Sequence, residues 1–527
     1  MFRAMSRKPV YIFVALLFYL YFRGIGDHGL IDPVEGINAS VSIHMYAAGN
    51  YFVPKIGESL TSGSTLGTWW LSALAVSIFG WGEFAVRFWS ALSGLGMILA
   101  ASMSAKSAGS ESSRSSWLAS SICAGMTLCF AVSQLASSHA VYSCLTALSM
   151  AGVVRSHDDK RWLILAHLSL SLAFIAHGFE GFLLPFVAVI VYSFLCDDYD
   201  LLKDFFTWPG GIIITVSLCG LYFVVLALVN PQVIHFMRCH TYSYSFGGFQ
   251  GIIAFLFVSF VPFQGFIIRA VYEIFPREYP AQRSPELFML VWALVFAVSS
   301  LLSGDILALC ACVPALSALI GRKLDIWLGR KNLYSVRMSV MLNIIIIVPV
   351  LYILMPYVSR DLPVASAALM SLIPWILLTM LFLFASWYYT KTKQIEKWVR
   401  NVPAAALLCL MPLAGVFNLT AERYSVRDIG LALRDRIEGK DWVIQYGVNY
   451  PSVYFYTLRN SILIDAELSD GVAEKRFAAS DAVINILWDR KERMFLIMPD
   501  DKHPDTPLPK NVFHIMETEN TLLLSNQ

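Results

Sequence analysis

Long apolar stretches recur along this 527-residue chain and are separated by short polar segments. A helix needs about 17–25 mainly apolar residues to cross the roughly 30 Å hydrocarbon core of a bilayer. By this measure the pattern predicts about 13 transmembrane helices, near residues 9–25, 84–105, 115–135, 139–154, 161–176, 179–195, 209–229, 250–268, 286–303, 305–320, 338–357, 362–386 and 401–418. The expected fold is therefore a polytopic α-helical membrane protein.

One further apolar segment, residues 65–80, is short and rich in tryptophan, so its length alone does not decide whether it crosses. If it lies on the surface, the N-terminus and six later loops share one side and carry 21 Lys and Arg residues between them. Because basic loops stay on the cytoplasmic side, this arrangement is favoured. It places the polar loop 26–83, and everything beyond residue 418, on the outer side.

The C-terminal part changes character. Residues 419–527 contain 13 Lys and Arg against 17 Asp and Glu, and helix-like and strand-like patterns alternate along them. This alternation is typical of a small soluble α/β domain. The expected organisation is a transmembrane domain at 1–418, with the external loop 26–83, followed by an external domain at 419–527.

Composition strengthens the membrane assignment. Hydrophobic residues make up 57% of the chain and charged residues 14%, and the mean hydropathy is +0.61. Average soluble domains contain about 25% charged residues. The net charge of +2 gives no indication of nucleic-acid binding.

The external loop contains signals for a short helix. Asp32 can act as its N-cap, Pro33 suits the first helical position, and Glu35 is the third residue. Gly49 predicts the end of the helix. Apolar residues spaced by four then share one face: Ile37, Val41 and Met45.

Two carboxylates at the start of this helix are the first candidates for chemistry. Asp32 or Glu35 could act as a general base toward a hydroxyl or amine, or hold a divalent cation that binds phosphate. The alternative is that they only cap the helix, which requires nothing beyond helix geometry. Glu58 lies in the same loop, and a solvated surface position is favoured for it.

Basic side chains on the outer side are candidates for binding an anionic lipid head group, namely Lys55, Arg87, Arg238 and Arg360. His177, at an external turn between two predicted spans, faces the same compartment as the loop. The alternative for each is an ordinary interfacial residue whose polar end reaches water. Asp305 follows Ser303 and Gly304 at another external turn, and a turn-forming role is favoured there.

Several motifs resemble those of the GT-C glycosyltransferases, in particular the lipid A aminoarabinose transferases and their protein O-mannosyltransferase-like relatives. The motifs in the first loop are Leu30-x-Asp32-Pro33-x-Glu35, Gly49-Asn50-Tyr51-x-Val53-Pro54, Leu66-Gly67-x-Trp69 and Phe79-Gly80-x-x-Glu83-Phe84-Ala85-x-Arg87. Those further along are Ala176-His177-Gly178, Leu184-Pro185, Pro314-Ala315-Leu316 and Gly439-x-x-x-Val443-x-x-Tyr446-Gly447.

The resemblance implies a transferase at the outer face of a bacterial inner membrane, with a periplasmic C-terminal domain. Such enzymes move a sugar from a polyprenyl-phosphate carrier to a lipid, such as lipid A, or to a protein acceptor. It implies that Glu35 or Asp32 is the acid/base carboxylate. It further implies that Lys55, Arg87, His177 and Glu58 lie near the substrates, and it leaves open whether a divalent metal takes part.

The chain departs from the family at charged positions. Uncharged residues replace the expected charged ones at Val34, Ile37, Ser62, Gly63 and Tyr142, and His177 replaces a lysine. These changes motivate an alternative function, a non-catalytic lipid-binding or assembly protein on the same scaffold. A transporter is a weaker alternative, because few ionisable residues lie within the predicted spans.

Overall fold

The computed structural model describes residues 7–57, 59–60, 66–106, 113–229, 255–275, 279–359, 362–464, 476–477, 492–500, 512–518 and 520–527. The chain divides into two compact units, which are described separately. The first, here the helical unit, comprises Met1–Arg23, Trp89–Val225 and Ser243–Val416. The second, here the mixed unit, comprises Gly24–Phe88, Leu226–Tyr242 and Phe417–Gln527. The external loop thus belongs to the same compact unit as the C-terminal region, although residues 1–418 were expected to form one domain.

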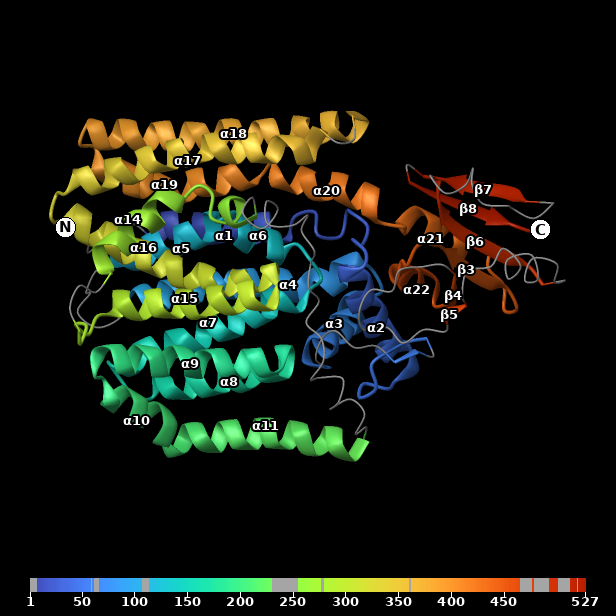
Figure 1. Ribbon diagram of the computed structural model, residues 1–527, viewed down its shortest axis with the longest axis horizontal. Coiled ribbons are helices and arrows are strands. Elements are labelled where there is room, and N and C mark those ends of the chain that lie inside the picture. Colours follow the sequence, from blue (N-terminus) through green and yellow to red (C-terminus); the bar gives the residue numbers. More distant parts are fainter. Residues whose placement is uncertain are drawn as a thin grey trace. The chain divides into compact units, whose positions relative to one another are not determined.

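The helical unit is a bundle of long helices (Figure 1). Its described helices are α1 (Arg7–Phe22), α4 (Glu83–Ala105, which starts in the mixed unit), α5 (Ser113–Gly125), α6 (Thr127–Ser133), α7 (Ser138–Ser156), α8 (Trp162–His177), α9 (Phe179–Cys196), α10 (Tyr199–Thr207), α11 (Pro209–Val229, whose last four residues belong to the mixed unit), α14 (Gln264–Ile274), α15 (Pro285–Ser303), the 3₁₀ helix η1 (Ile306–Cys312), α16 (Val313–Gly329), α17 (Leu333–Ser359), α18 (Leu362–Lys391) and α19 (Ile395–Leu410). Helix α20 (Leu413–Tyr424) starts in the helical unit and continues into the mixed unit.

The membrane character expected from the sequence is confirmed. Within the described residues, seven helices are long and apolar enough to span a bilayer, or eight if α5 and α6, which meet at a bend of 61°, form one span. Helices α4 and α11 match the predicted spans 84–105 and 209–229 within one residue at each end. The total of about 13 spans stays a prediction.

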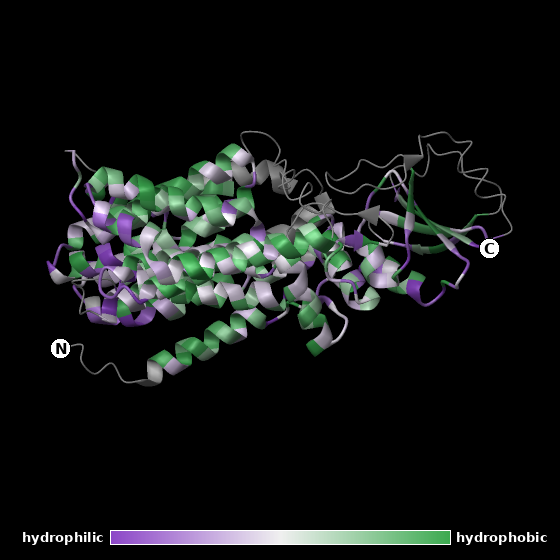
Figure 2. Ribbon diagram, turned by 90° about the horizontal axis from the view of Figure 1, so that it is seen from below, coloured by the Kyte–Doolittle hydropathy of each residue, from purple (hydrophilic) through white to green (hydrophobic). Residues whose placement is uncertain are grey.

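Polar residues of the helical unit gather at one end of its helices (Figure 2). The short loop between α7 and α8 lies at this end, with Arg155 in the last turn of α7 before it and Arg161 at the N-cap of α8 after it. Because these two helices run in opposite directions, the start of α7 and the end of α8 lie together at the opposite end. The turn between α15 and η1 lies at that same opposite end.

The mixed unit contains a six-stranded sheet with strand order β5-β4-β3-β6-β8-β7. Pairing is parallel among β3, β4, β5 and β6 and antiparallel from β6 through β8 to β7. The strands are β3 (Trp442–Tyr446), β4 (Ser461–Ile464), β5 (Arg476–Phe477), β6 (Met494–Pro499), β7 (Phe513–Glu517) and β8 (Thr521–Ser525). The α/β pattern predicted for the C-terminal region is therefore confirmed.

The two faces of this sheet have separate apolar cores, because successive side chains of a strand point to opposite faces. Val443 packs with Ile429 and Leu433 of α21 (Arg427–Arg434), whereas Ile444, the next residue, packs with Leu496 and Leu524 on the other face. Helix α22 (Ser452–Thr457) contacts α21. Helix α21 thus packs on a core formed by every second side chain of the strands.

The external loop folds onto this helix pair. Helix α2 (Val34–Ala48) packs on α3 (Leu66–Phe79) and on α22, and the two-stranded hairpin of β1 (Lys55–Ile56) and β2 (Ser59–Leu60) follows α2. The predicted apolar face of α2 is confirmed, since Ile37, Val41 and Met45 are buried. Its predicted end is confirmed at Gly49, which takes the left-handed conformation with φ +67°. At 14 residues, α3 is too short to cross a bilayer without help.

Candidate functional site

The centre of the mixed unit is a fully buried ion pair between Glu35 of α2 and Arg87 of α4. Arg87 Nε donates to Glu35 Oε1 and Nη2 to Glu35 Oε2, both at 2.7 Å, and neither side chain is exposed. This bidentate geometry is the strong form of a guanidinium–carboxylate contact. Glu35 Oε2 also accepts from the backbone N–H of Ile31 at 2.9 Å.

Every N–H of the Arg87 guanidinium has a protein acceptor. Nη1 donates to the carbonyl oxygens of Ile25 and His28, and Nη2 to that of Gly29, each at 2.8 Å. With the two bonds to Glu35, these account for all five donors of an arginine. Arg87 in this conformation therefore holds residues 25–35 of the loop, and binding a phosphate would first require one of these bonds to break.

The loop residue His28 is kept neutral in this environment. Burial, followed by the positive charge of Arg87, lowers the pKa of His28 to about 4. The buried cluster therefore holds one carboxylate and one guanidinium without a further cation near neutral pH.

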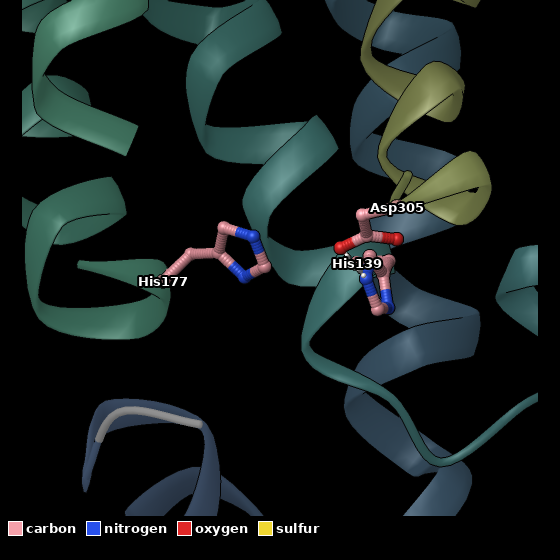
Figure 3. A group of neighbouring side chains, drawn as sticks. All are labelled: His139, His177 and Asp305. Atoms are coloured by element: carbon pink, nitrogen blue, oxygen red, sulfur yellow. Dashed lines mark hydrogen bonds and ion pairs between the residues drawn. The ribbon is translucent and has the colours of Figure 1, made fainter. Parts of the chain in front are cut away.

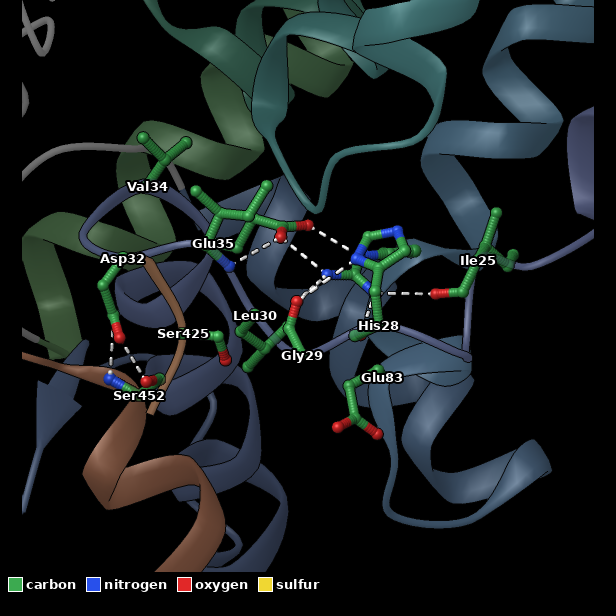
Figure 4. Close-up of polar contacts among 12 residues, drawn as sticks. Ile25, His28, Gly29, Leu30, Asp32, Val34, Glu35, Glu83, Ser425 and Ser452 are labelled. Atoms are coloured by element: carbon green, nitrogen blue, oxygen red, sulfur yellow. Dashed lines mark hydrogen bonds and ion pairs between the residues drawn. The ribbon is translucent and has the colours of Figure 1, made fainter. Parts of the chain in front are cut away.

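Asp32 turns in a different direction from Glu35 and contacts the C-terminal region (Figure 4). Its Oδ1 accepts from the backbone N–H of Ser452 at 3.1 Å, and its Oδ2 accepts from the Ser452 hydroxyl. The prediction that Asp32 is the N-cap of its own helix is wrong: the N-cap of α2 is Pro33, and its side chain makes no capping bond. Asp32 instead satisfies a free N–H in the first turn of α22, where a carboxylate is favoured.

The close approach of Asp32 depends on Gly36. A Cβ at position 36 would lie 1.7 Å from Asp32 Oδ1 and 2.8 Å from the Ser452 nitrogen. A hydrogen at this position is therefore needed for the contact between Asp32 and α22.

The pKa of Asp32 is raised from 3.8 to about 7. Burial is the largest cause and the negative charge of Glu35 adds to it, while the two hydrogen bonds from Ser452 oppose the shift. Asp32 thus exchanges its proton near neutral pH, which suits a general acid or base.

The raised pKa of Asp32 predicts a pH-dependent stability. Between pH 4 and 7 the folded state holds a proton that the unfolded chain has released, so the free energy of unfolding falls by about 1.4 kcal/mol per pH unit. We expect the thermal midpoint of the detergent-solubilised protein to fall from pH 4 to 7 and then to level. Asp32→Asn should flatten this dependence. Equal slopes for the two proteins would contradict it.

A second set of polar contacts ties the loop to the C-terminal region. The backbone N–H of Leu30 donates to the Tyr456 hydroxyl at 3.1 Å, and that hydroxyl donates to Glu83 Oε1 at 3.2 Å. Burial, followed by the charge of Glu83, raises the pKa of Tyr456. Arg427 Nε lies 3.1 Å from Glu83 Oε1. Leu30 and Glu83 belong to the motifs quoted for the loop, but nothing in those motifs indicated that they would meet Tyr456 and Arg427.

The remaining residues predicted from the loop lie elsewhere. Lys55 is half-buried on β1, and its charge, after burial, contributes to lowering the pKa of His44. Outside the described residues lie Glu58, Ser62, Gly63, Arg238 and Arg360. The structure therefore brings together Asp32, Glu35 and Arg87 but gives each carboxylate its own partner.

The predicted residue His177 belongs to the helical unit, where it joins His139 and Asp305 (Figure 3). His139 Nε2 lies 2.8 Å from Asp305 Oδ2, and His177 Nδ1 lies 3.2 Å from Ser138 Oγ. Asp305 also accepts from the backbone N–H of Ala308 at 3.4 Å, as expected of a turn residue. His139 was not predicted as a site residue. The sequence did hold a signal for it, because His139 starts one predicted span and His177 follows the end of the next, which places both on the same side of the membrane.

The fold defines a class, a polytopic helical membrane protein with the GT-C fold and an α/β region at its C-terminal end. Two crystal structures of ArnT from Cupriavidus metallidurans share this fold. The apo structure has a TM-score of 0.78 with 16% identity over 98% of both chains. The structure bound to undecaprenyl phosphate has a TM-score of 0.77 with 16% identity over 99% of this chain and 98% of the other. Since ArnT is a lipid A aminoarabinose transferase, the resemblance predicted from the motifs is confirmed at the level of the fold.

Sequence comparison adds little to this likeness. No protein-family model matches the chain. An uncharacterized protein of Aquifex aeolicus (strain VF5) is 26% identical over 234 residues, which are 43% of this chain and 45% of that protein. The matched region thus spans less than half of that relative.

Proposed function

We propose that this protein is a glycosyltransferase that moves a sugar from a polyprenyl-phosphate carrier to a lipid A-like or protein acceptor. The proposed place of the reaction is the outer face of the bacterial inner membrane, with the C-terminal region in the periplasm. The observation that carries the proposal is the fold shared with ArnT over nearly the whole length of both chains. One of those ArnT structures holds undecaprenyl phosphate, a carrier lipid of the proposed donor class.

Asp32 is the residue we assign to proton transfer. A general base must be partly deprotonated at the working pH, and the pKa of Asp32 of about 7 meets this condition. Each carboxylate oxygen can accept two hydrogen bonds, so the bonds from Ser452 leave an acceptor position on each. In the proposed step an acceptor hydroxyl attacks the anomeric carbon, Asp32 takes its proton, and the carrier leaves as a phosphate.

Glu35 and Arg87 receive a different role in this proposal. Because Glu35 and Arg87 bind each other and the loop backbone, we assign them the role of holding the loop in place and not of contacting substrates. Lys55, Glu58 and His177 remain candidates for substrate binding. A polyprenyl-phosphate donor requires no nucleotide-binding motif, because the leaving group is already a phosphate.

The same buried pair favours a second candidate function. A scaffold that uses the charges of Glu35 and Arg87 only for structure could bind lipids or assist assembly without catalysis. It carries Tyr142 and His177 where the resembled family has an acid and a lysine. This alternative predicts that Asp32 is dispensable while the mixed unit is required.

Mass spectrometry of cells with and without this chain separates the two candidates. A transferase should remove a sugar from one acceptor pool when the chain is deleted, while the sugar-loaded carrier accumulates. The measurement covers total lipid A, other glycolipids, glycoproteins and polyprenyl-phosphate sugars. Unchanged acceptor and carrier pools would contradict the transferase and favour the non-catalytic protein.

A further inference from the structure

The cluster of His139, His177 and Asp305 contains a complete set of metal-ligating groups. The three residues come from the start of α7, the end of α8 and the turn before η1, and their side chains are neighbours (Figure 3). These ligand atoms all lie within 4.8 Å of one another, and no other such group of three occurs within the residues that the structure describes. His139 and Asp305 are buried, with 6% and 1% of their surface exposed.

His177 is held in the orientation that a metal ligand needs. Its ring stacks on that of Tyr142, with centroids 4.3 Å apart and planes 26° apart. When Nδ1 donates to Ser138 Oγ, the lone pair is on Nε2, the arrangement usual in metal-bound histidines. That Nε2 is buried and makes no hydrogen bond within the described part of the chain, and Glu180 Oε2 lies 3.7 Å from it.

His139 and Asp305 form the other half of the cluster. Their contact of 2.8 Å shares one proton between Nε2 and Oδ2. A metal ion can replace this proton, because neutral imidazole and carboxylate are both ligands in their deprotonated forms. Tetrahedral bonds of about 2.0–2.1 Å require ligand atoms about 3.3 Å apart. The site would be complete if His139 Nε2 and Asp305 Oδ2 moved slightly apart and His177 Nε2 moved slightly closer to them.

We propose that His139, His177 and Asp305 bind one divalent transition metal ion, with Zn²⁺ the ion best suited to two imidazoles and one carboxylate. Three protein ligands leave the fourth position of a tetrahedral zinc open. Glu180, 27% exposed beside His177, is the side chain able to close that position. If the proposed transferase function holds, the open position accepts a phosphate oxygen of the carrier, in place of the lysine charge that the resembled family has at residue 177.

Direct metal binding tests the site without any sugar donor. The full-length protein in detergent is stripped with a chelator and titrated with Co²⁺, a spectroscopic substitute for Zn²⁺, and the zinc content is measured after re-loading. We expect about one bound metal per chain, with visible bands of tetrahedral Co²⁺. His177→Ala and Asp305→Asn should each weaken binding more than about 100-fold, since even the loss of a hydrogen-bond partner of a metal ligand costs about 10–100-fold.

His157→Ala is the matched control, because this histidine is exposed at the opposite end of α7. Binding that persists in His177→Ala and Asp305→Asn, or no binding by the unmodified protein at micromolar metal, overturns the site. Asp305→Asn keeps the size of the side chain, and gel filtration with thermal melting establishes that each variant folds. Metal binding lost in Glu180→Gln would overturn the open fourth position, whereas retained binding supports it.

A transfer assay separates this inference from the proposed function. Metal binding without any sugar transfer would leave the metal site standing and overturn the transferase. Transfer that proceeds unchanged in the stripped protein would overturn the phosphate-binding role of the metal. Transfer that is lost on stripping and restored by Zn²⁺ supports both.

Discussion

Replacement of Asp32 by asparagine is expected to lower the rate of sugar transfer by about 10²–10⁴-fold, the usual contribution of a general base. The change keeps the size of the side chain and an oxygen that can accept one of the two Ser452 hydrogen bonds, while it removes the ability to take a proton. The rate constant is measured with purified protein, a polyprenyl-phosphate sugar and membrane acceptor. Asp27→Asn, at an exposed aspartate of the same loop, is the matched control and should retain activity.

The pH profile distinguishes a base from a residue that only supports the fold. Since the base works deprotonated, kcat/KM of the unmodified protein should rise with pH and level above about 7, the pKa of Asp32. The Ser452 hydroxyl lowers this pKa, so Ser452→Ala should move the rise to higher pH. Full activity of Asp32→Asn, or a profile that Ser452→Ala leaves in place, would rule out the base role.

Arg87→Met is expected to destabilise the mixed unit by about 3–5 kcal/mol, the cost of leaving a buried charge without its partner. The Glu35 carboxylate would keep no guanidinium, and the carbonyl oxygens of Ile25, His28 and Gly29 would lose their donors. The measurement is the thermal midpoint of the full-length protein in detergent, together with the rate of protease cleavage within residues 24–57. Both should report a loosened loop.

Two further variants show whether this loss comes from the ion pair. Glu35→Gln combined with Arg87→Met removes the orphaned carboxylate, so the double variant should recover part of the stability lost in Arg87→Met. Arg427→Gln is the control, because its pair with Glu83 is partly exposed and should contribute less than about 1 kcal/mol. An Arg87→Met protein as stable as the Arg427→Gln protein would refute the structural role.

The combination of outcomes bears on the function. A folded but inactive Asp32→Asn protein alongside an unstable Arg87→Met protein would assign the two loop carboxylates separate tasks, chemistry for Asp32 and architecture for Glu35. If instead Asp32→Asn alters only stability, both carboxylates serve the fold, and the non-catalytic lipid-binding protein becomes the better account.

The sequence by itself determined the membrane class, the bounds of several helices and the α/β character of the C-terminal region. Helix α11 occupies the predicted 209–229, and the buried face of α2 follows the predicted spacing of Ile37, Val41 and Met45. These features depend on hydropathy and periodicity within a window of about 20 residues, so neighbouring residues suffice to specify them. The motifs between Leu30 and Arg87 carried the resemblance that the fold comparison confirms.

Only the tertiary structure decided the partners of the charged residues. Asp32 was expected to cap its own helix, but its carboxylate contacts Ser452, 420 residues later. Glu35 pairs with Arg87 across 52 residues, and His139 meets Asp305 across 166. A buried carboxylate pairs with a donor that is buried beside it. Burial raises the free-energy cost of leaving the carboxylate without such a partner. Which donors are buried together depends on how distant segments pack, and no local pattern of residues records that packing.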